Sequence, residues 1–372
     1  MSVAQRLERL RGTLEAAGLD ALLVTNPENR RYLSGYTGRD GGLDSAGTLL
    51  IGTTDVVLIT DGRYTEQAAR ECPDLRVAVR QAPLAPLAAE LIREWGCRRL
   101  GIEATHLTVA QRDDLEAATR QKGIPPELVP TRGVVEAQRV VKDTEEIAAI
   151  ERAVRITDEV FEALLGYLRP GLTERDVAVE IARQMRAHGA EDMAFDPIVA
   201  SGPNGALPHA VPSDRALALG ETITIDMGAR YAGYCSDMTR TVCLGEAPTA
   251  VRAAHDAVLR AQRLCEEGLR PGLNGQEADA LARGALEAAG RGEQYVHGTG
   301  HGLGLEIHED PRLGRLSAEY VLAAGMVVTV EPGVYVTGWG GVRIEDTVLV
   351  IADGARVLSR ASKQLVVPHS GA

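Results

Sequence analysis

The segment ETITIDMG, residues 221–228, decides the fold, because a related segment, MVVTVEPG, follows at residues 326–333. Its neighbours repeat as well. RPGL occurs at 169–172 and 270–273, each time before an amphipathic helix pattern, and SDMTRTV at 236–242 returns as IEDTVLV at 344–350. The copies lie 101 to 108 residues apart. One αβ unit is therefore used twice, which predicts an α+β domain with pseudo-twofold symmetry, its helices packed against a curved antiparallel sheet.

Aligning the two copies places acidic residues on each other. Asp226 corresponds to Glu331, each after a strand-like run, and Asp237 corresponds to Glu345, each at the start of the return strand. Within each half the two acids should face each other across a hairpin, so the fold would gather four carboxylates. Buried carboxylates without a neutralising charge repel one another and take up protons. Divalent cations resolve this repulsion, and carboxylates that bridge two ions form the clamp of two-metal hydrolysis.

A glycine-rich run supplies an imidazole for the same site. Residues 297–308 are HGTGHGLGLEIH, with His301 in the middle. One imidazole with four carboxylates suits Mn²⁺, Co²⁺ or Zn²⁺ better than Ca²⁺ or Mg²⁺. The run lacks the G-x-G-x-x-G spacing of a dinucleotide-binding loop, and EIHEDP follows where such a loop would begin a helix. We therefore expect two divalent ions, with Mn²⁺ favoured.

The first 125 or so residues alternate helix and strand patterns, which predicts a smaller α/β domain. Its patterns indicate helices at 3–17, 65–70 and 84–95, and strands at 21–24, 48–51 and 56–60. The sequence NPEN at 26–29 suggests a turn. The stretch IPPELVP at 124–130 cannot continue a helix, and we interpret it as a linker. The predicted domains are residues 1–127 and 135–372.

A long helix should open the second domain. Asp143 and Glu146 have the spacing of a capping box at its start. Apolar residues then recur at the i, i+3, i+4 spacing of one helix face. They are Ile147, Ile150, Val154, Thr157, Phe161, Leu164 and Leu168.

Composition argues against several classes of partner. The formal net charge of −12 disfavours binding to a nucleic-acid backbone or an anionic membrane. The N-terminus lacks the apolar run of a signal peptide, and no stretch approaches the roughly 18 apolar residues that span a bilayer. Five scattered cysteines without a CxxC pair predict reduced thiols. These features predict a cytoplasmic protein.

Five segments resemble the pita-bread metallopeptidases, a family that includes aminopeptidase P, prolidase and methionine aminopeptidase. They are IDMG at 225–228, SDMTR at 236–240, GHGLG at 300–304, VEPG at 330–333 and RIED at 343–346. Further segments resemble the Xaa-Pro-cleaving branch: YTG at 36–38, TDGRY at 60–64, NGALPH at 204–209 and residues 301–309. The resemblance covers nearly the whole chain. It implies a pita-bread catalytic domain preceded by a creatinase-like N-terminal domain.

The resemblance also implies a role for each metal ligand. Asp226 would chelate one ion, while His301 and Glu331 would hold the other. Asp237 and Glu345 would bridge both ions. A hydroxide held between the ions would be the nucleophile, because coordination lowers the pKa of water toward neutrality.

Four residues are expected to assist catalysis, one of them also a metal ligand. Glu331 matches the general base that takes the proton of the water. His297 and His308 are placed to stabilise the oxyanion or to contact substrate. Tyr335 matches a position credited with relaying a proton to the leaving prolyl nitrogen, although an ordinary strand aromatic is an alternative.

Substrate contacts are implied for His209, His297 and Arg343. Arg343 could instead orient a metal-binding carboxylate. His209 and His297 could be ordinary hydrogen-bonded histidines.

These features predict an Xaa-Pro metallo-exopeptidase that acts on proline-containing peptides. The DGRY sequence at 61–64 favours aminopeptidase P, with Xaa-Pro dipeptidase (prolidase) as the alternative. Within the motifs, Arg343 is the cation that could bind the carboxylate of a dipeptide. A non-catalytic pita-bread binding module would not need all five ligands, and a two-metal phosphatase would need a Lys/Arg cluster beside the acids. The resemblance and the glycine-rich loop at 34–45 also predict a homodimer.

Overall fold

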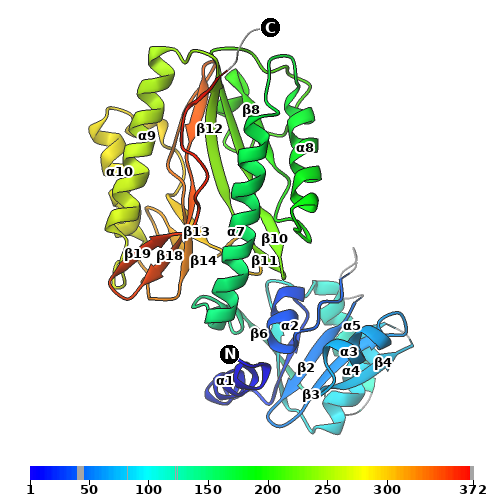
Figure 1. Ribbon diagram of the computed structural model, residues 1–372. Coiled ribbons are helices and arrows are strands. Elements are labelled where there is room, and N and C mark those ends of the chain that lie inside the picture. Colours follow the sequence, from blue (N-terminus) through cyan, green and yellow to red (C-terminus); the bar gives the residue numbers. More distant parts are fainter. Residues whose placement is uncertain (40–45, 82, 122, 124, 369–372) are drawn as a thin grey trace. The chain divides into compact units, whose positions relative to one another are not determined.

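The computed structural model describes residues 1–39, 46–81, 83–121, 123 and 125–368. It divides into two compact units, Met1–Arg139 and Val140–Ala372 (Figure 1). Residues 40–45 of the expected loop and residue 124 of the expected linker lie outside the described residues. Among the helices within these ranges, none combines the length and the apolar character that crossing a bilayer requires.

The first unit is built on a six-stranded sheet in the order β4-β3-β2-β1-β5-β6. Its strands are β1 (Ala21–Val24), β2 (Thr48–Gly52), β3 (Val56–Asp61), β4 (Arg76–Arg80), β5 (Arg99–Glu103) and β6 (Glu127–Thr131). Its helices are α1 (Val3–Ala16), α2 (Pro27–Ser34), α3 (Thr65–Glu71), α4 (Leu84–Glu94), α5 (Val109–Gln121) and α6 (Glu136–Arg139). Strand β1, with four buried apolar residues, pairs antiparallel with β2 and parallel with β5. This mixed sheet with helices is the α/β architecture that the alternating patterns predict.

Two local predictions in this unit were wrong. Residues 26–29 form no isolated turn, because Asn26 is the N-cap of α2 and its side chain accepts a hydrogen bond from the Asn29 N–H. Pro27 is favoured at that position, where a backbone N–H would have no helical partner. The expected linker contributes β6, which pairs parallel with β5. Because β6 lies at the edge of the sheet, it tolerates Pro130.

The long helix α7 (Thr144–Leu165) opens the second unit as predicted. Asp143 accepts hydrogen bonds from the N–H groups of Glu145 and Glu146, and the Glu146 side chain accepts from the Asp143 N–H. This reciprocal capping box satisfies the free backbone donors at the helix start. Ile150 and Phe161, on the predicted apolar face, are buried.

Three further α-helices and fourteen strands complete the described part of the second unit. The helices are α8 (Glu174–Ala187), α9 (Thr249–Gly268) and α10 (Gly275–Ala288), with short 3₁₀ turns at η1 (Gly202–Ala206) and η2 (Gly292–Gln294). The strands of the first half are β7 (Asp192–Met193), β8 (Ile198–Ser201), β9 (Thr222–Met227), β10 (Ala229–Tyr231), β11 (Tyr234–Cys235) and β12 (Met238–Leu244). Those of the second half are β13 (Gly300–Gly302), β14 (Glu309–Leu313), β15 (Val327–Val330), β16 (Gly333–Val336), β17 (Gly340–Arg343), β18 (Asp346–Ile351), β19 (Gly354–Val357) and β20 (Val366–Val367).

The second unit consists of two matching halves, as the repeat predicts. Strands β9 and β12 pair antiparallel in the first half, and β15 and β18 do so in the second. Each hairpin has its own apolar core, formed with α7 and α8 in the first half and with α9 and α10 in the second. Figure 1 shows the two helix pairs on opposite sides of the strands. The predicted α+β architecture with a pseudo-twofold repeat is confirmed.

Hydrogen bonds join the two halves close to the predicted metal ligands. The Glu345 N–H donates to the Thr239 carbonyl oxygen at 3.0 Å. The Arg343 N–H donates to the Thr241 hydroxyl at 3.0 Å, and that hydroxyl donates to the Arg343 carbonyl oxygen at 2.9 Å. These bonds fix the backbone of one half against the other at the point where the acids converge.

A buried carboxylate at the start of α8 holds the segment that carries His209. Glu174 is fully buried. It accepts hydrogen bonds from the N–H and hydroxyl groups of Ser201 at 2.7 and 2.8 Å, and from those of Ser213 at 3.0 and 2.6 Å. The Asn204 amide donates to it as well. One side chain therefore anchors several points between residues 201 and 213.

Replacing this carboxylate tests its contribution to stability. Glu174→Ala should lower the free energy of unfolding by roughly 3 kcal/mol or more, because buried donors would lose their acceptor. Urea denaturation followed by circular dichroism measures the change. The control Glu180→Ala, on the same helix, removes an ion pair with the exposed Arg183 and should cost less than about 1 kcal/mol. Equal losses in both variants would contradict the anchoring role.

Candidate active site

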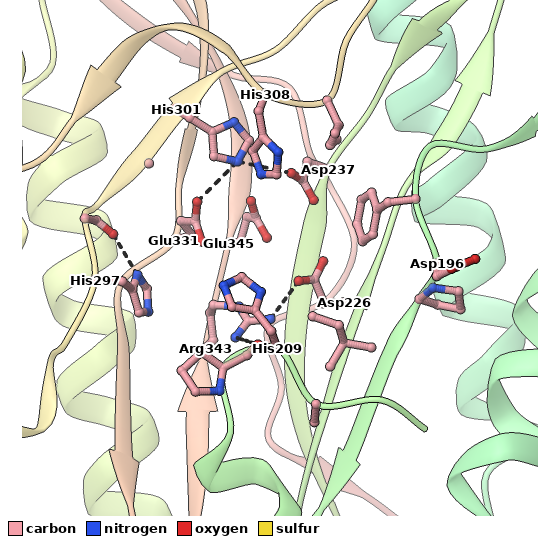
Figure 2. A pocket seen from close by; sticks show the side chains of 18 of the residues that line it. Asp196, His209, Asp226, Asp237, His297, His301, His308, Glu331, Arg343 and Glu345 are labelled. Carbon is pink, nitrogen blue, oxygen red and sulfur yellow. Dashed lines mark hydrogen bonds and ion pairs between the residues drawn. The ribbon is translucent and has the colours of Figure 1, made fainter. Parts of the chain in front are cut away.

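A cavity of about 610 Å³ is lined by residues from both halves of the second unit. Nine of the ten predicted site residues line it; Tyr335 does not. The nine are His209, Asp226, Asp237, His297, His301, His308, Glu331, Arg343 and Glu345. Figure 2 shows the carboxyl groups of the two halves gathered opposite one another, with His301 and His308 at one side.

The acids lie on or beside the two central hairpins. Asp226 is part of β9 and stands opposite Thr239 of β12, so Asp237 is two residues out of register with it. In the second half, Glu331 directly follows β15 and Glu345 directly precedes β18, at the end of their ladder. We expected the two acids of each half to face each other across its hairpin. The second half meets this expectation more closely than the first.

Burial and repulsion between neighbouring acids raise the pKa values of Asp237, Glu331 and Glu345. Burial, and then the negative charges of Glu345 and Asp226, raise the pKa of Asp237 well above its ordinary value. The pKa of Glu345 is raised well above its ordinary value by burial and then by Glu331 and Asp226. Burial raises the pKa of Glu331 to about 7. Keeping all these groups ionised at neutral pH requires more positive charge than the surrounding side chains supply.

His301 is held in one tautomer with its lone pair toward the acids. Its Nδ1 lies 3.0 Å from the carbonyl oxygen of Gly302, an acceptor, so Nδ1 carries the proton and Nε2 is unprotonated. Burial lowers the pKa of the ring to about 3, which keeps it neutral. Nε2 lies 3.5 Å from both Asp237 Oδ2 and Glu331 Oε1. A nitrogen lone pair that faces two carboxylates is favourable when a cation lies between these groups. A hydrogen bond from the other ring nitrogen to a backbone carbonyl is the usual support of a histidine that binds a metal.

The donor set fits divalent metal ions. Asp237, His301 and Glu345 each offer a ligand atom, and these atoms lie within 4.8 Å of one another. Asp226 and Glu331 lie outside this tightest group. Within the described part of the chain, Asp226 Oδ1 is buried without a hydrogen-bond partner, an arrangement that a bound cation would satisfy. Carboxylate oxygens with one neutral imidazole suit Mn²⁺, Co²⁺ or Zn²⁺.

Arg343 lines the cavity, but protein groups engage each nitrogen of its guanidinium. It is 3% exposed. Its Nη2 donates to Asp226 Oδ2 at 2.6 Å, its Nε donates to the Thr239 hydroxyl at 3.1 Å, and its Nη1 donates to the Tyr335 hydroxyl at 2.9 Å. The Pro208 carbonyl oxygen also accepts from Nη1. This geometry matches the alternative in which Arg343 orients a metal-binding carboxylate.

His297, which lines the cavity, and Tyr335, which is not among the lining residues, form a hydrogen-bonded pair. The Nδ1 of His297 lies 2.7 Å from the Gly298 carbonyl oxygen, so Nδ1 carries the proton. Its Nε2 lies 2.8 Å from the Tyr335 hydroxyl and therefore accepts the tyrosine proton. Burial lowers the pKa of His297 to about 4, which keeps the ring neutral. A chain of hydrogen bonds thus runs from His297 through Tyr335 and Arg343 to Asp226.

His209 and His308 are exposed on the cavity wall. The His308 ring lies 4.4 Å from the His301 ring, edge to face. Neither His209 nor His308 makes a side-chain hydrogen bond with a residue that the structure describes. Both rings are available to a ligand.

Sequence reasoning missed a second arginine in the cavity. Arg312 of β14 stands directly opposite His301 of β13, and residues opposite each other on antiparallel strands project from the same face. Arg312 is exposed, and its guanidinium makes no hydrogen bond or ion pair within the described residues. Burial and then the positive charge of Arg312 lower the pKa of His308. Burial alternates along β14, where Glu309, Pro311 and Leu313 are buried, but the sequence EDPRL does not alternate apolar and polar residues, so no local pattern marked Arg312.

An apolar wall was also missed. Phe195, Ile198, Pro212 and Ile307 line the cavity along with the acids. Phe195, Ile198 and Pro212 belong to no motif, and Ile307 belongs to the run at 297–308 that was read only for its histidines.

The chain matches two family models over most of its length. Residues 148–352 match metallopeptidase family M24, and residues 6–141 match the creatinase/prolidase N-terminal domain. The predicted family resemblance is confirmed by both.

Individual relatives extend over nearly the whole chain. The structure of an Xaa-Pro dipeptidase from Bacillus anthracis has 40% identity and a TM-score of 0.92, covering 98% of this chain and 99% of that one. An Xaa-Pro dipeptidase of Pyrococcus furiosus is 34% identical, covering 97% of this chain and 99% of the relative. The structure of an X-Pro aminopeptidase from Thermotoga maritima has 33% identity and a TM-score of 0.86, covering 95% and 99% of the two chains. The chain therefore belongs to metallopeptidase family M24, as a metal-dependent peptidase with a pita-bread catalytic domain behind a creatinase/prolidase N-terminal domain.

Proposed function

We propose that the protein is an Xaa-Pro dipeptidase that hydrolyses the bond between a first residue and a C-terminal proline. The observation that carries this proposal is Arg312, an exposed guanidinium in the cavity that makes no ion pair within the described residues. A dipeptidase needs a cation at the end of its cleft to bind the prolyl carboxylate. Arg312 can form a two-pronged pair with a carboxylate, whereas each guanidinium nitrogen of Arg343 already has a protein partner.

The cavity walls support recognition of the proline ring. The Xaa-Pro bond is a tertiary amide without an N–H, so the ring must be recognised by shape. Phe195, Ile198, Pro212 and Ile307 provide apolar surface beside the acids. Two of the relatives are Xaa-Pro dipeptidases by name, in agreement with this substrate class.

Asp226, Asp237, His301, Glu331 and Glu345 would hold two divalent ions, for which we propose Mn²⁺ first and Co²⁺ or Zn²⁺ as alternatives. Bound ions would polarise the scissile carbonyl and lower the pKa of a coordinated water. Asp237 and Glu345 are the proposed bridging ligands.

The protein's own groups would move the protons. Glu331 would accept the proton of the attacking water at a carboxylate oxygen. Tyr335 would relay a proton toward the prolyl nitrogen, and Arg343 and His297 fix the position of its hydroxyl from two sides. His308, which is exposed beside His301, would donate to the developing oxyanion.

Removal of the first residue from longer Xaa-Pro peptides, the aminopeptidase P activity, is the second candidate. A second hollow of about 900 Å³ shares His297, Gly298 and Gly314 with the main cavity and offers room for residues beyond proline. The X-Pro aminopeptidase relative favours this alternative.

Metal removal tests the proposed mechanism. Exhaustive chelation should abolish hydrolysis of Ala-Pro, and added Mn²⁺ or Co²⁺ should restore it. Asp237→Ala should lose both ions together in elemental analysis, because one bridging ligand serves both. The control Asp196→Ala removes an exposed acid from the cavity wall and should keep both ions. Full activity in metal-free protein, or one ion fully retained in Asp237→Ala, would contradict the mechanism.

Arg312 distinguishes the two candidate activities. For a dipeptidase, Arg312→Gln should lower kcat/KM for Ala-Pro by roughly 10²-fold, since a charge-assisted pair with the substrate carboxylate is lost. Ala-Pro amide, which has no carboxylate, should be a poor substrate of both proteins. The control Arg315→Gln changes an exposed arginine of the second hollow and should leave kcat/KM unchanged. If Ala-Pro-Ala is cleaved as efficiently as Ala-Pro, and Arg312→Gln affects neither, the aminopeptidase assignment replaces ours.

A homodimer remains part of the proposal, supported by the family resemblance and by the glycine-rich sequence at 34–45. In it, the N-terminal unit of one subunit would border the active site of the other. Sedimentation velocity at the assay concentration should therefore give the mass of two chains. A fully active species with the mass of one chain would remove this element.

A further inference from the structure

The catalytic unit contains a buried ion pair that the proposed chemistry does not use directly. On α10, the Nε and Nη2 atoms of Arg283 donate to the two carboxylate oxygens of Asp279 at 2.6 and 2.9 Å. The side chains are 9% and 2% exposed. A buried pair of this kind is often no more stabilising than apolar side chains of similar size. Its position therefore points to a role in holding a particular geometry.

The pair grips alternate residues of the segment that leads to His301. Arg283 Nη1 donates to the Tyr295 carbonyl oxygen at 3.2 Å, and Nη2 donates to the His297 carbonyl oxygen at 2.7 Å. Asp279 Oδ1 accepts from the Thr299 N–H at 3.0 Å and from the Thr299 hydroxyl at 2.8 Å. One edge of residues 295–299 is thereby fixed to the helix.

Neighbouring contacts leave this segment little freedom to shift. The Arg283 guanidinium lies 4.2 Å from the centre of the Tyr295 ring. A side chain at Gly298 would place its Cβ 2.7 Å from the Leu313 carbonyl oxygen, so the backbone passes close to the next strand. The Thr299 N–H that Asp279 holds belongs to the same peptide group as the Gly298 carbonyl oxygen, so Asp279 also fixes the acceptor that sets the tautomer of His297.

We propose that Asp279 and Arg283 are positioning residues for the reaction, which act by fixing His297 so that its Nε2 accepts the Tyr335 proton. The path runs from α10 to the His297 carbonyl, through the imidazole to Tyr335, and on to Arg343. The proposal rests on the proposed Xaa-Pro peptidase function. Asp279 and Arg283 are not among the described residues that line the main cavity, and neither side chain touches a reacting group.

Kinetics of Arg283 variants test this role. Arg283→Gln should lower kcat for Ala-Pro about 10- to 100-fold, because a small misplacement of a catalytic group has effects of this size. KM and metal content should stay within about twofold. The substitution leaves the metal ligands unchanged, and it also leaves unchanged Arg312, the proposed partner of the substrate carboxylate. Arg283→Lys keeps the charge and part of the donor set, so it should recover part of the lost kcat.

A core variant on the same helix provides the matched control. Leu286→Ala removes buried apolar packing from α10 and leaves the ion pair in place. It should lower the unfolding temperature at least as much as Arg283→Gln while keeping the parental kcat. An equal loss of kcat in both variants would reduce the role of Arg283 to general stability and overturn the proposal.

A double-mutant cycle and a spectroscopic readout identify the path. In a His297→Ala background, Arg283→Gln should cause no further loss of kcat, because both changes act through one group. Losses that multiply would overturn the proposal.

In ¹H–¹³C spectra, the ring signal that disappears in His297→Ala should shift or broaden in Arg283→Gln and stay in place in Leu286→Ala. An unmoved signal in Arg283→Gln would overturn it as well. Failure of the unmodified protein to cleave any Xaa-Pro peptide would instead reject the proposed function, while the ring signal would still decide the role of Arg283.

Discussion

The repulsion among four carboxyl groups, three buried and one half-buried, is the constraint on which the catalytic unit depends. Burial and the neighbouring negative charges raise the pKa values of Asp237 and Glu345, so the arrangement opposes its own ionisation. The energy that holds these groups together comes from elsewhere, from two apolar cores and from hydrogen bonds between the hairpins. A repeated αβ unit suits this task, because each half stabilises its own hairpin and contributes two acids to the shared site.

The polar residues around the acids are arranged to leave room for cations. His301 directs its one ring N–H at a backbone carbonyl, and the lone pair of the other ring nitrogen faces the carboxylates. Arg343 neutralises one oxygen of Asp226, while the other oxygen has no hydrogen-bond partner among the described residues. If further protein cations filled the cavity, the carboxylates would be satisfied without metal. The partial neutralisation that is present therefore favours ion binding over a closed network of salt bridges.

The sequence predicted those features that are encoded locally or twice. The capping box of Asp143 and Glu146 depends on residues three apart, and the four acids could be recognised because two copies of one pattern align. The position of Arg312 depends on the register between β13 and β14, which shifts between His301 and Gly302 and has no local signal. Strand β6 was missed because Pro130 breaks helices everywhere, but its effect on a strand depends on whether that strand lies at a sheet edge. The family and the fold class were thus accessible from the sequence, and so was the set of residues that gathers at one cavity, whereas the partners of each side chain required the tertiary structure.

The two arginines of the cavity show why motif composition alone does not separate dipeptidase from aminopeptidase activity. Arg343 belongs to a recognisable motif, but it is buried and its nitrogens are bonded to Asp226, Thr239 and Tyr335. A substrate carboxylate could bind it only by displacing these bonds, at a penalty of buried unsatisfied groups. Arg312 lies outside the family-like motifs, yet it loses only solvent when a carboxylate approaches. Under the proposed function, substrate length would depend on exposed residues of the cavity such as Arg312, which can change without disturbing the buried charge balance that the metal site requires.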